Sequence, residues 1–431
     1  MRAPISIALA LLAATGAARA QDFDARGQAT YVWQDKPSFR APYSGANSLL
    51  PQRELSYSFT ATAFLGWRAW KGGEIYFNPE VTQGVPLSRL AGLGGFTNGE
   101  IQRTAGPNPR LYRARLFLRQ TWGFGGGSDK VEADANQLAG AADRRRLVLT
   151  AGNIAVGDLF DDNAYSHDAR TQFLNWSLVT HGAYDFAADA RGYTWGAALE
   201  YFHDAWAVRA GRFMMPQQSN GLPLDSRIMR HYGDQAELEH AHEIAGRPGK
   251  IRLLAYRNVA DMGSFREALD AAAATGGTPD LTLFRQRRAK VGAGINLEQS
   301  LTESAGVFLR ASRHDGKTET FAFTEIDRSL SGGLRVQGSA WKRAGDSAGL
   351  AFARNGLSAD HRDYLAAGGL GFFLGDGRLN YRPENIAEAF YSLGAAKGYW
   401  FTVDWQRIRN PGYNADRGPV TVASLRFHAE F

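Results

Sequence analysis

The sequence predicts an all-β fold, a transmembrane antiparallel up-and-down β-barrel with long extracellular loops and short periplasmic turns. Three observations lead to this prediction. They are an N-terminal export signal, alternating apolar and polar strands long enough to cross a bilayer, and a C-terminal amphipathic strand that ends on an aromatic residue. Together they describe a sheet with an apolar outer face and a polar inner face.

The N-terminus has the parts of a secretory signal peptide. Arg2 precedes an apolar run from Ile5 to Ala14, and Ala18-Arg19-Ala20 follows as a small-residue cleavage site. We therefore predict that residues 1–20 form a signal peptide cut before Gln21 and that residues 21–431 form one barrel domain. The apolar run is too short for a bilayer-spanning helix, which needs about 20 apolar residues, and no other stretch comes close. A helical membrane protein is excluded.

Charge and cysteine content narrow the class further. Cleavage removes Arg2 and Arg19 and leaves 411 residues with a formal net charge of +4, down from +6. Lys and Arg are spread among acids rather than gathered in a stripe, which excludes a nucleic-acid partner. Because Cys is absent, backbone pairing and burial must stabilise the exported chain. The mean hydropathy of −0.33 looks soluble because the inward residues of a barrel are polar.

Alternation with a period of two is the main signal for strands. Between Leu55 and Trp67, apolar residues at odd positions alternate with mainly polar residues, Phe64 being the exception. Lys71-Gly72-Gly73 predicts a tight turn, and Glu74–Asn78 begins the return strand. Similar alternation predicts strands at Asp24–Trp33, Leu111–Trp122, Arg146–Gly152, Tyr193–Phe202, Trp206–Met214, Lys250–Asn258, Lys290–Leu297, Gly306–Arg313, Leu334–Gln337, Tyr399–Gln406 and Val420–Phe431.

The connections between these strands are of two kinds. His203-Asp204 is very short, whereas Gln34–Arg53 and Met215–Asp234 are long, as in barrels with turns at one end and loops at the other. Phe265–Ala274 is interpreted as a helix within a loop. A soluble β-sandwich or jelly roll also alternates. The export signal, the strand length and the aromatic strand ends together favour the membrane barrel.

The last strand carries a further signal. The odd positions from Thr421 to Phe431 form an apolar face, and the even positions from Val422 to Glu430 form a mainly polar one. A terminal Phe on such a strand resembles the signal by which the barrel assembly machinery recognises its substrates. We therefore predict Phe431 to be an assembly signal and that machinery to be a partner.

Several segments together resemble one known family. They are LYRARLFLRQTWG (Leu111–Gly123), FDDNAYSHDARTQFLNW (Phe160–Trp176), YDFAADARGYTWGAALEY (Tyr184–Tyr201), NIAEAFYSL (Asn385–Leu393) and NPGYNADRGPVTVASLRFHAEF (Asn410–Phe431). Their order and content resemble the carbohydrate-selective porin family of the OprB type. The resemblance implies a barrel of 16 strands in a Gram-negative outer membrane, passive uptake of glucose-like monosaccharides and small oligosaccharides, and no cofactor.

Three arginines suggest the chemistry of the lumen. Arg113, Arg115 and Arg119 lie at alternate positions, and an arginine facing lipid at mid-membrane would cost about 2–4 kcal/mol. We therefore predict that they point into the lumen. Guanidinium groups offer several donors in a fixed fork, which suits vicinal hydroxyls. The alternative, that they only neutralise acids and brace the wall, stays open.

An acidic stretch follows, and it has three interpretations. Asp158, Asp161, Asp162 and Asp168 could form a calcium site, but their spacing does not match an EF-hand. Ser166, His167 and Asp168 could suggest a hydrolase, but contiguous residues seldom converge on one reacting atom. We favour a constriction loop whose acids pair with the arginines, with no metal and no catalytic residue.

Aromatic and further charged residues complete the candidates. Tyr193, Trp195, Trp400 and Trp405 could be sugar platforms, but interfacial aromatic girdles explain outward rings such as Tyr193 and Trp405. Trp176, beside the acidic stretch, is predicted to face the lumen. The remaining pore-lining candidates are Arg170 and Arg191, and the wall candidates are Glu384, Glu388 and Asp404.

The leading hypothesis is a passive channel for sugars. A general anion-preferring porin is the alternative, and an outer-membrane barrel enzyme is a weaker one because no catalytic constellation is evident. Outer-membrane lipid and lipopolysaccharide are expected to surround the barrel, as a monomer or a homotrimer.

Overall fold

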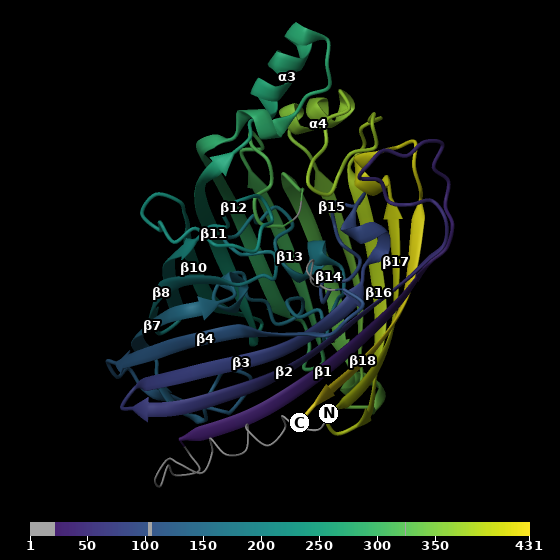
Figure 1. The fold of residues 1–431 in the computed structure, drawn as a ribbon. Coiled ribbons are helices and arrows are strands. Elements are labelled where there is room, and N and C mark those ends of the chain that lie inside the picture. The colour runs from purple at the N-terminus through teal and green to yellow at the C-terminus, as the bar shows by residue number, and fades with distance from the viewer. Residues whose placement is uncertain (1–21, 102–105, 324) are drawn as a thin grey trace, which may run out of the picture.

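The computed structural model describes residues 22–101, 106–323 and 325–431, and it shows a closed antiparallel barrel of sixteen strands. Each strand pairs with its neighbours along the chain, and β1 closes the sheet against β18 (Figure 1). Both described chain ends lie at one end of the barrel, and the long loops lie at the other. The predicted fold class is confirmed. The predicted signal peptide, residues 1–20, lies outside the described residues.

The bounds of the elements are as follows. The barrel strands are β1 (Phe23–Lys36), β2 (Glu54–Trp70), β3 (Gly73–Val85), β4 (Arg110–Gly123), β7 (Arg145–Ile154), β8 (Thr194–His203), β9 (Trp206–Met214), β10 (Tyr232–Ile244), β11 (Arg247–Met262), β12 (Gln286–Ser300), β13 (Ala305–His314), β14 (Arg328–Gln337), β15 (Ser347–Gly356), β16 (Glu384–Ala396), β17 (Tyr399–Arg409) and β18 (Val420–Glu430). The connections contain a two-stranded sheet, β5 (Ser128–Val131) and β6 (Gly140–Asp143), and the helices α2 (Trp176–Val179), α3 (Phe265–Thr275) and α4 (Ala359–Ala366). Among the described residues, no helix is long and apolar enough to cross a membrane.

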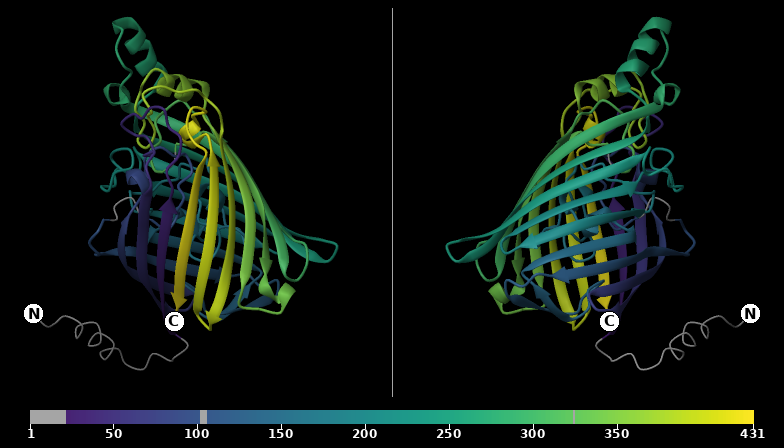
Figure 2. Two further views of the ribbon diagram at one scale, coloured as in Figure 1. Left: turned by 90° about the vertical axis from the view of Figure 1, so that its right-hand side faces the viewer. Right: turned by 90° about the vertical axis from the view of Figure 1, so that its left-hand side faces the viewer.

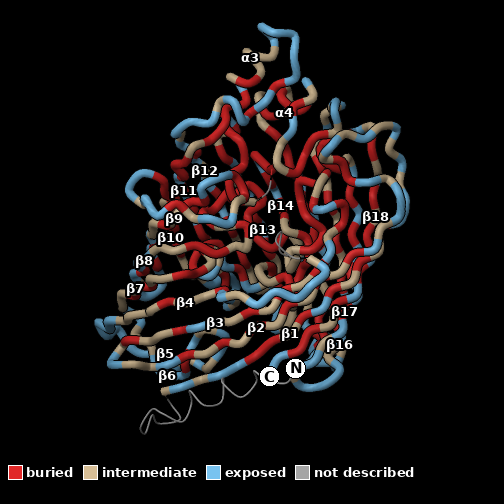
Figure 3. Tube along the Cα trace, in the orientation of Figure 1, coloured by how far each residue is buried: buried red, intermediate tan, exposed pale blue. Residues whose placement is uncertain are grey.

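Buried residues alternate with exposed or half-buried ones along the strands (Figure 3). In β17, Phe401, Val403 and Trp405 are exposed on the outside. Thr402 and Asp404, between them, are buried on the inside. An apolar outer face and a polar inner face are what a bilayer requires of a barrel.

Three of the sixteen barrel strands were not predicted from the sequence. β10, β15 and β16 were not among the expected strands, and the predicted loop Met215–Asp234 is shorter because β10 begins at Tyr232. The outward side of β10 includes Asp234, Ala236 and His240, so its two faces differ little in hydropathy. Backbone pairing with strands on both sides forms this strand where its side-chain pattern is weak.

The connections are long at the extracellular end of the barrel and mostly short at the periplasmic end, as predicted. One periplasmic connection is an exception. β4 and β7 are joined on the periplasmic side by a long connection, residues 124–144, that contains β5 and β6. Part of this connection enters the barrel, where Asn136 accepts a hydrogen bond from Asn78 Nδ2 at 2.8 Å. On the opposite side, the predicted loop helix is confirmed as α3, which protrudes beside α4 (Figure 1).

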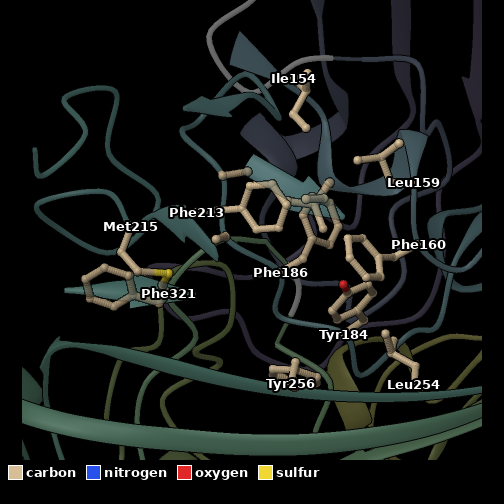
Figure 4. Packing of buried hydrophobic residues seen from close by; sticks show 14 of the residues in the cluster. Ile154, Leu159, Phe160, Tyr184, Phe186, Phe213, Met215, Leu254, Tyr256 and Phe321 are labelled. Atoms are coloured by element: carbon tan, nitrogen blue, oxygen red, sulfur yellow. The ribbon is translucent and has the colours of Figure 1, made fainter. Parts of the chain in front are cut away.

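The packed core lies inside the barrel, because long loops fold into it. Most of the connection between β7 and β8, residues 155–193, is buried. Its residues Phe160, Tyr184 and Phe186 pack with the inward side chains of Phe213 and Tyr256 (Figure 4). We call residues 155–193 the inner loop.

A second loop stabilises the inner loop. Gly99 N donates to Leu174 O at 2.7 Å, and Trp176 N donates to Phe96 O at 2.9 Å. The loop between β3 and β4 therefore contacts the inner loop through backbone hydrogen bonds, and both lie within the barrel.

Candidate functional site

A cavity of about 1380 Å³ occupies the lumen. Its lining extends from Asn220 and Phe373 in extracellular loops to Lys397 and Gly398 in a periplasmic turn. Eight of the ten predicted pore-lining residues line it: Arg115, Arg119, Asp158, Asp162, Asp168, Arg170, Trp176 and Arg191. Arg113 and Asp161 are not in this lining.

The prediction that Arg113 points into the lumen is wrong. The register between β3 and β4 shifts at Ala114, since Asn78 pairs with Arg115 whereas Pro79 pairs with Arg113. This one-residue bulge reverses the alternation. Arg113 is exposed near the extracellular end of β4, and its guanidinium lies 5.1 Å from the ring centroid of Trp195.

Two lumen arginines are held by carboxylates. Arg115 makes two hydrogen bonds of 2.6 Å to Asp158, as the constriction-loop hypothesis expects. Arg170 donates to Glu100 at 2.8 Å and to Glu80 at 3.2 Å. Burial lowers the pKa of Arg170, but Glu100 and Glu80 raise it more, so the net pKa is above its usual value. These pairs fix one side of the cavity. Glu80 and Glu100 were not singled out from the sequence.

Two more lumen arginines, Arg119 and Arg191, have no ion pair with any described residue. Arg119 donates to Asn136 O at 2.9 Å and stacks 5.1 Å from the ring of Tyr76. Arg191 stacks 4.8 Å from the ring of Tyr112. Both line the cavity, so their remaining N–H groups are available to a solute.

An aromatic cluster faces the same cavity. Trp176 and Phe323 stack with ring centroids 5.2 Å apart, and Phe186 lies 4.7 Å from Phe323. All three line the cavity. The sequence indicated Trp176 but not the phenylalanines, because nothing in their local pattern shows that two loops bring them together.

The other aromatic candidates lie as follows. The prediction that Tyr193 is an outward girdle residue is wrong, because its ring is buried against the lumen arginine Arg115, 5.2 Å from the guanidinium carbon. It precedes β8 and belongs to the inner loop. Trp405 is 43% exposed on the outer face, as expected. Trp400 faces inward and lines the cavity near its periplasmic mouth.

Asp161 anchors the inner loop rather than lining the pore. Its carboxylate accepts hydrogen bonds from Arg310 Nε at 2.9 Å, Asn296 Nδ2 at 2.6 Å and His181 N at 2.6 Å. Asp161 and Arg310 are each 1% exposed at the side chain. The acidic stretch therefore pairs mostly with arginines on distant strands, which spacing along the chain does not reveal.

The neighbouring groups do not assemble a metal or hydrolase site. Asp162 lies 3.3 Å from Arg252, and Asp168 accepts a hydrogen bond from Thr171. Within the described ranges, no group of three or more His, Asp or Glu side chains is arranged to hold a metal ion. Ser166 Oγ donates to Leu178 O at 2.7 Å, so it faces the backbone rather than His167.

Wall carboxylates also hold the loops in place. Glu384 accepts backbone hydrogen bonds from Gly94, Gly95 and Gly412 at 2.8–3.1 Å. Glu388 accepts them from Leu174 N and Asn175 N at 2.5 and 2.9 Å. All three predicted wall residues, Glu384, Glu388 and Asp404, are buried inward, and the first two hold loops inside the barrel.

The closed barrel with loops folded into a charged, aromatic-lined lumen defines the class of outer-membrane porins. The model of the carbohydrate-selective porin family, OprB, matches residues 52–431, and the chain belongs to this family. It is a porin of the outer membrane. No curated protein sequence matches the chain.

Solved structures show the same fold. A structure of Pseudomonas putida OprB at high pH has a TM-score of 0.72 and 17% sequence identity, over 95% of this chain and 94% of that chain. The outer-membrane channel DcaP of Acinetobacter baumannii has a TM-score of 0.52 and 8% identity, over 95% and 97%. Identities this low support the barrel fold alone.

Proposed function

We propose that this porin lets neutral sugars diffuse passively through its lumen cavity. The observation that carries the proposal is that one cavity is lined both by aromatic rings and by two guanidinium groups that form no ion pair with a described residue. Arg119 and Arg191 offer N–H groups to hydroxyls, and Trp176 and Phe323 offer ring faces to the apolar face of a pyranose. Narrow lumens of this kind select solutes by their lining groups.

The balance of charge favours a neutral solute. Six basic side chains line the cavity: Arg26, Arg115, Arg119, Arg170, Arg191 and Lys397. Six acidic ones do so as well: Glu100, Asp134, Asp158, Asp162, Asp168 and Glu430. Equal numbers give no net formal charge, whereas a strongly anion-selective pore needs an excess of positive charge. The positive charges of Arg119 and Arg191 could still attract anions locally. An anion-preferring porin is therefore the second candidate function.

Single-channel recording tests the proposal. Wild-type conductance should be blocked by glucose or maltose, and Arg191→Gln should weaken the block about 10-fold, because a hydrogen bond to a charged group contributes roughly 1.5 kcal/mol or more. Arg119→Gln should act in the same direction. The matched control is Arg113→Gln, which removes an arginine from the outer face of the same strand as Arg119.

Three outcomes separate the candidates. Sugar block that weakens in the lumen variants and persists in Arg113→Gln supports the sugar channel. Strong anion selectivity without sugar block would favour the anion-preferring porin. Sugar block that is equal in all three variants would show that these arginines only brace the wall.

A further inference from the structure

The outer surface of β13–β17 carries a group of arginines near its extracellular edge. The outward positions of these strands include Arg313, Arg328, Arg354, Arg407 and Arg409, and all five are exposed. Each lies within three residues of the extracellular end of its strand. We call these five residues the arginine patch. The strands that carry it, coloured green to yellow, form one part of the barrel wall (Figure 2).

The outward faces of these strands carry no acid that could neutralise the patch. The outward positions of β13–β17 contain no Asp or Glu, and the carboxylates of these strands, Glu384, Glu388 and Asp404, are buried inward. None of the five arginines forms an ion pair with a described residue. Two have neutral partners, since Arg328 donates to Tyr381 Oη at 3.4 Å and Arg407 to Thr421 Oγ1 at 3.0 Å.

The register places these like charges side by side. Arg313 is directly opposite Arg328 across the β13–β14 pair. Arg354 and Arg409 both pair with Asn385, from either side, so the three lie in one row. With strands about 4.8 Å apart, the two outer arginines of the row are roughly 10 Å apart at the backbone. Like charges directly opposite one another destabilise a sheet, so an anion between them would relieve repulsion.

The patch lies at the upper boundary of the apolar band. Two positions closer to the periplasm, the outward residues become Leu330 beside Arg328, Phe352 beside Arg354, and Trp405 beside Arg407. These apolar residues are 43–57% exposed. Apolar side chains contact acyl chains, and the arginines just above them reach the level of the lipid headgroups.

We propose that the arginine patch binds the phosphate groups of a polyanionic lipid in the outer leaflet. The uncompensated charge supplies the attraction, and planar guanidinium forks match phosphate oxygens. The apolar band below accommodates acyl chains, which a free phosphate ion lacks. The lumen is not involved, so this site is independent of the proposed sugar conduction.

Native mass spectrometry of the detergent-solubilised protein tests the proposal. Bis-phosphorylated lipid A should bind the wild type, and lipid A stripped of both phosphates should bind much more weakly. The triple variant Arg313→Gln/Arg354→Gln/Arg409→Gln should lose about 100-fold in affinity for the phosphorylated lipid, at roughly five-fold for each arginine. The variant Arg313→Lys/Arg354→Lys/Arg409→Lys should keep most of the affinity.

The control removes three lysines from the periplasmic side, as Lys71→Gln/Lys130→Gln/Lys342→Gln, and should bind like the wild type. Heat-modifiable gel migration shows that each variant is folded. Equal binding of both lipids, or unchanged binding by the triple arginine variant, would overturn the proposal. Displacement of the lipid by excess sodium pyrophosphate would show that the patch binds phosphate groups whether or not a lipid carries them, which would contradict the choice of a lipid as the ligand. Loss of an oligomer in the triple variant, with lipid binding intact, would assign the patch to a second copy of the chain.

Discussion

The role of Asp161 in anchoring the inner loop can be tested by substitution. Its neighbour Asp162, which has the same charge, is a matched control. Asp161→Ala leaves the guanidinium of Arg310 buried without its carboxylate. Removing one partner of a buried ion pair costs about 3–5 kcal/mol. Asp162 has the same charge, but its side chain is 59% exposed and its partner Arg252 keeps two other carboxylates. An ion pair with one solvent-exposed partner contributes only about 0–1 kcal/mol to the stability of the fold.

The assay is single-channel recording with both alanine variants. In Asp161→Ala, the inner loop loses its hydrogen bonds from Asn296 and His181 as well as Arg310, so the conductance should rise and fluctuate. Asp162→Ala removes one charge from the lumen but leaves the inner loop anchored, so its traces should be as quiet as those of the wild type. Equal fluctuation in the two variants would refute the view that Asp161 fixes the constriction.

The pH dependence of this anchor has a definite sign. Burial raises the pKa of Asp161, but Arg310 and His181 lower it more, so the net pKa is below its usual value. A carboxyl group with a lowered pKa in the folded state stabilises the fold fully above its unfolded-state pKa, about 3.9, and the stabilisation is lost as the pH falls towards its folded-state pKa. Wild-type conductance should therefore stay quiet from neutral pH to about pH 5, and the fluctuation should appear only in stronger acid.

Two further predictions concern assembly and metals. Removing Phe431, which exchanges backbone hydrogen bonds of 2.6 and 3.0 Å with Gly27, should lower the yield of heat-modifiable barrel in the outer membrane and leave export intact; a normal yield would contradict its role as an assembly signal. Treatment with EDTA should leave the conductance unchanged, because Asp158, Asp161 and Asp162 already pair with arginines. Chelator-sensitive conductance that disappears in aspartate variants would restore the calcium hypothesis.

The sequence by itself determined the barrel and most of its strands. Side chains of a strand alternate with a period of two, and a bilayer requires an apolar outer face. The strands at 55–67 and 399–406 can therefore be recognised from their own residues, without knowledge of the strands they pair with. Where most outward residues are small or polar, as Asp234, Ala236 and His240 are in β10, the two faces differ less, and pairing with both neighbouring strands defines the element.

Tertiary structure decided which candidates meet in the lumen. The bulge at Ala114 turns Arg113 outward while Arg115 stays inside, and it arises from the register between β3 and β4. Asp161 meets Arg310, 149 residues away, because the inner loop folds into the barrel. Phe323 reaches Trp176 for the same reason. Alternation is a local property of one strand, whereas strand register and the burial of loops depend on contacts between distant segments. The local pattern therefore cannot predict register or loop burial.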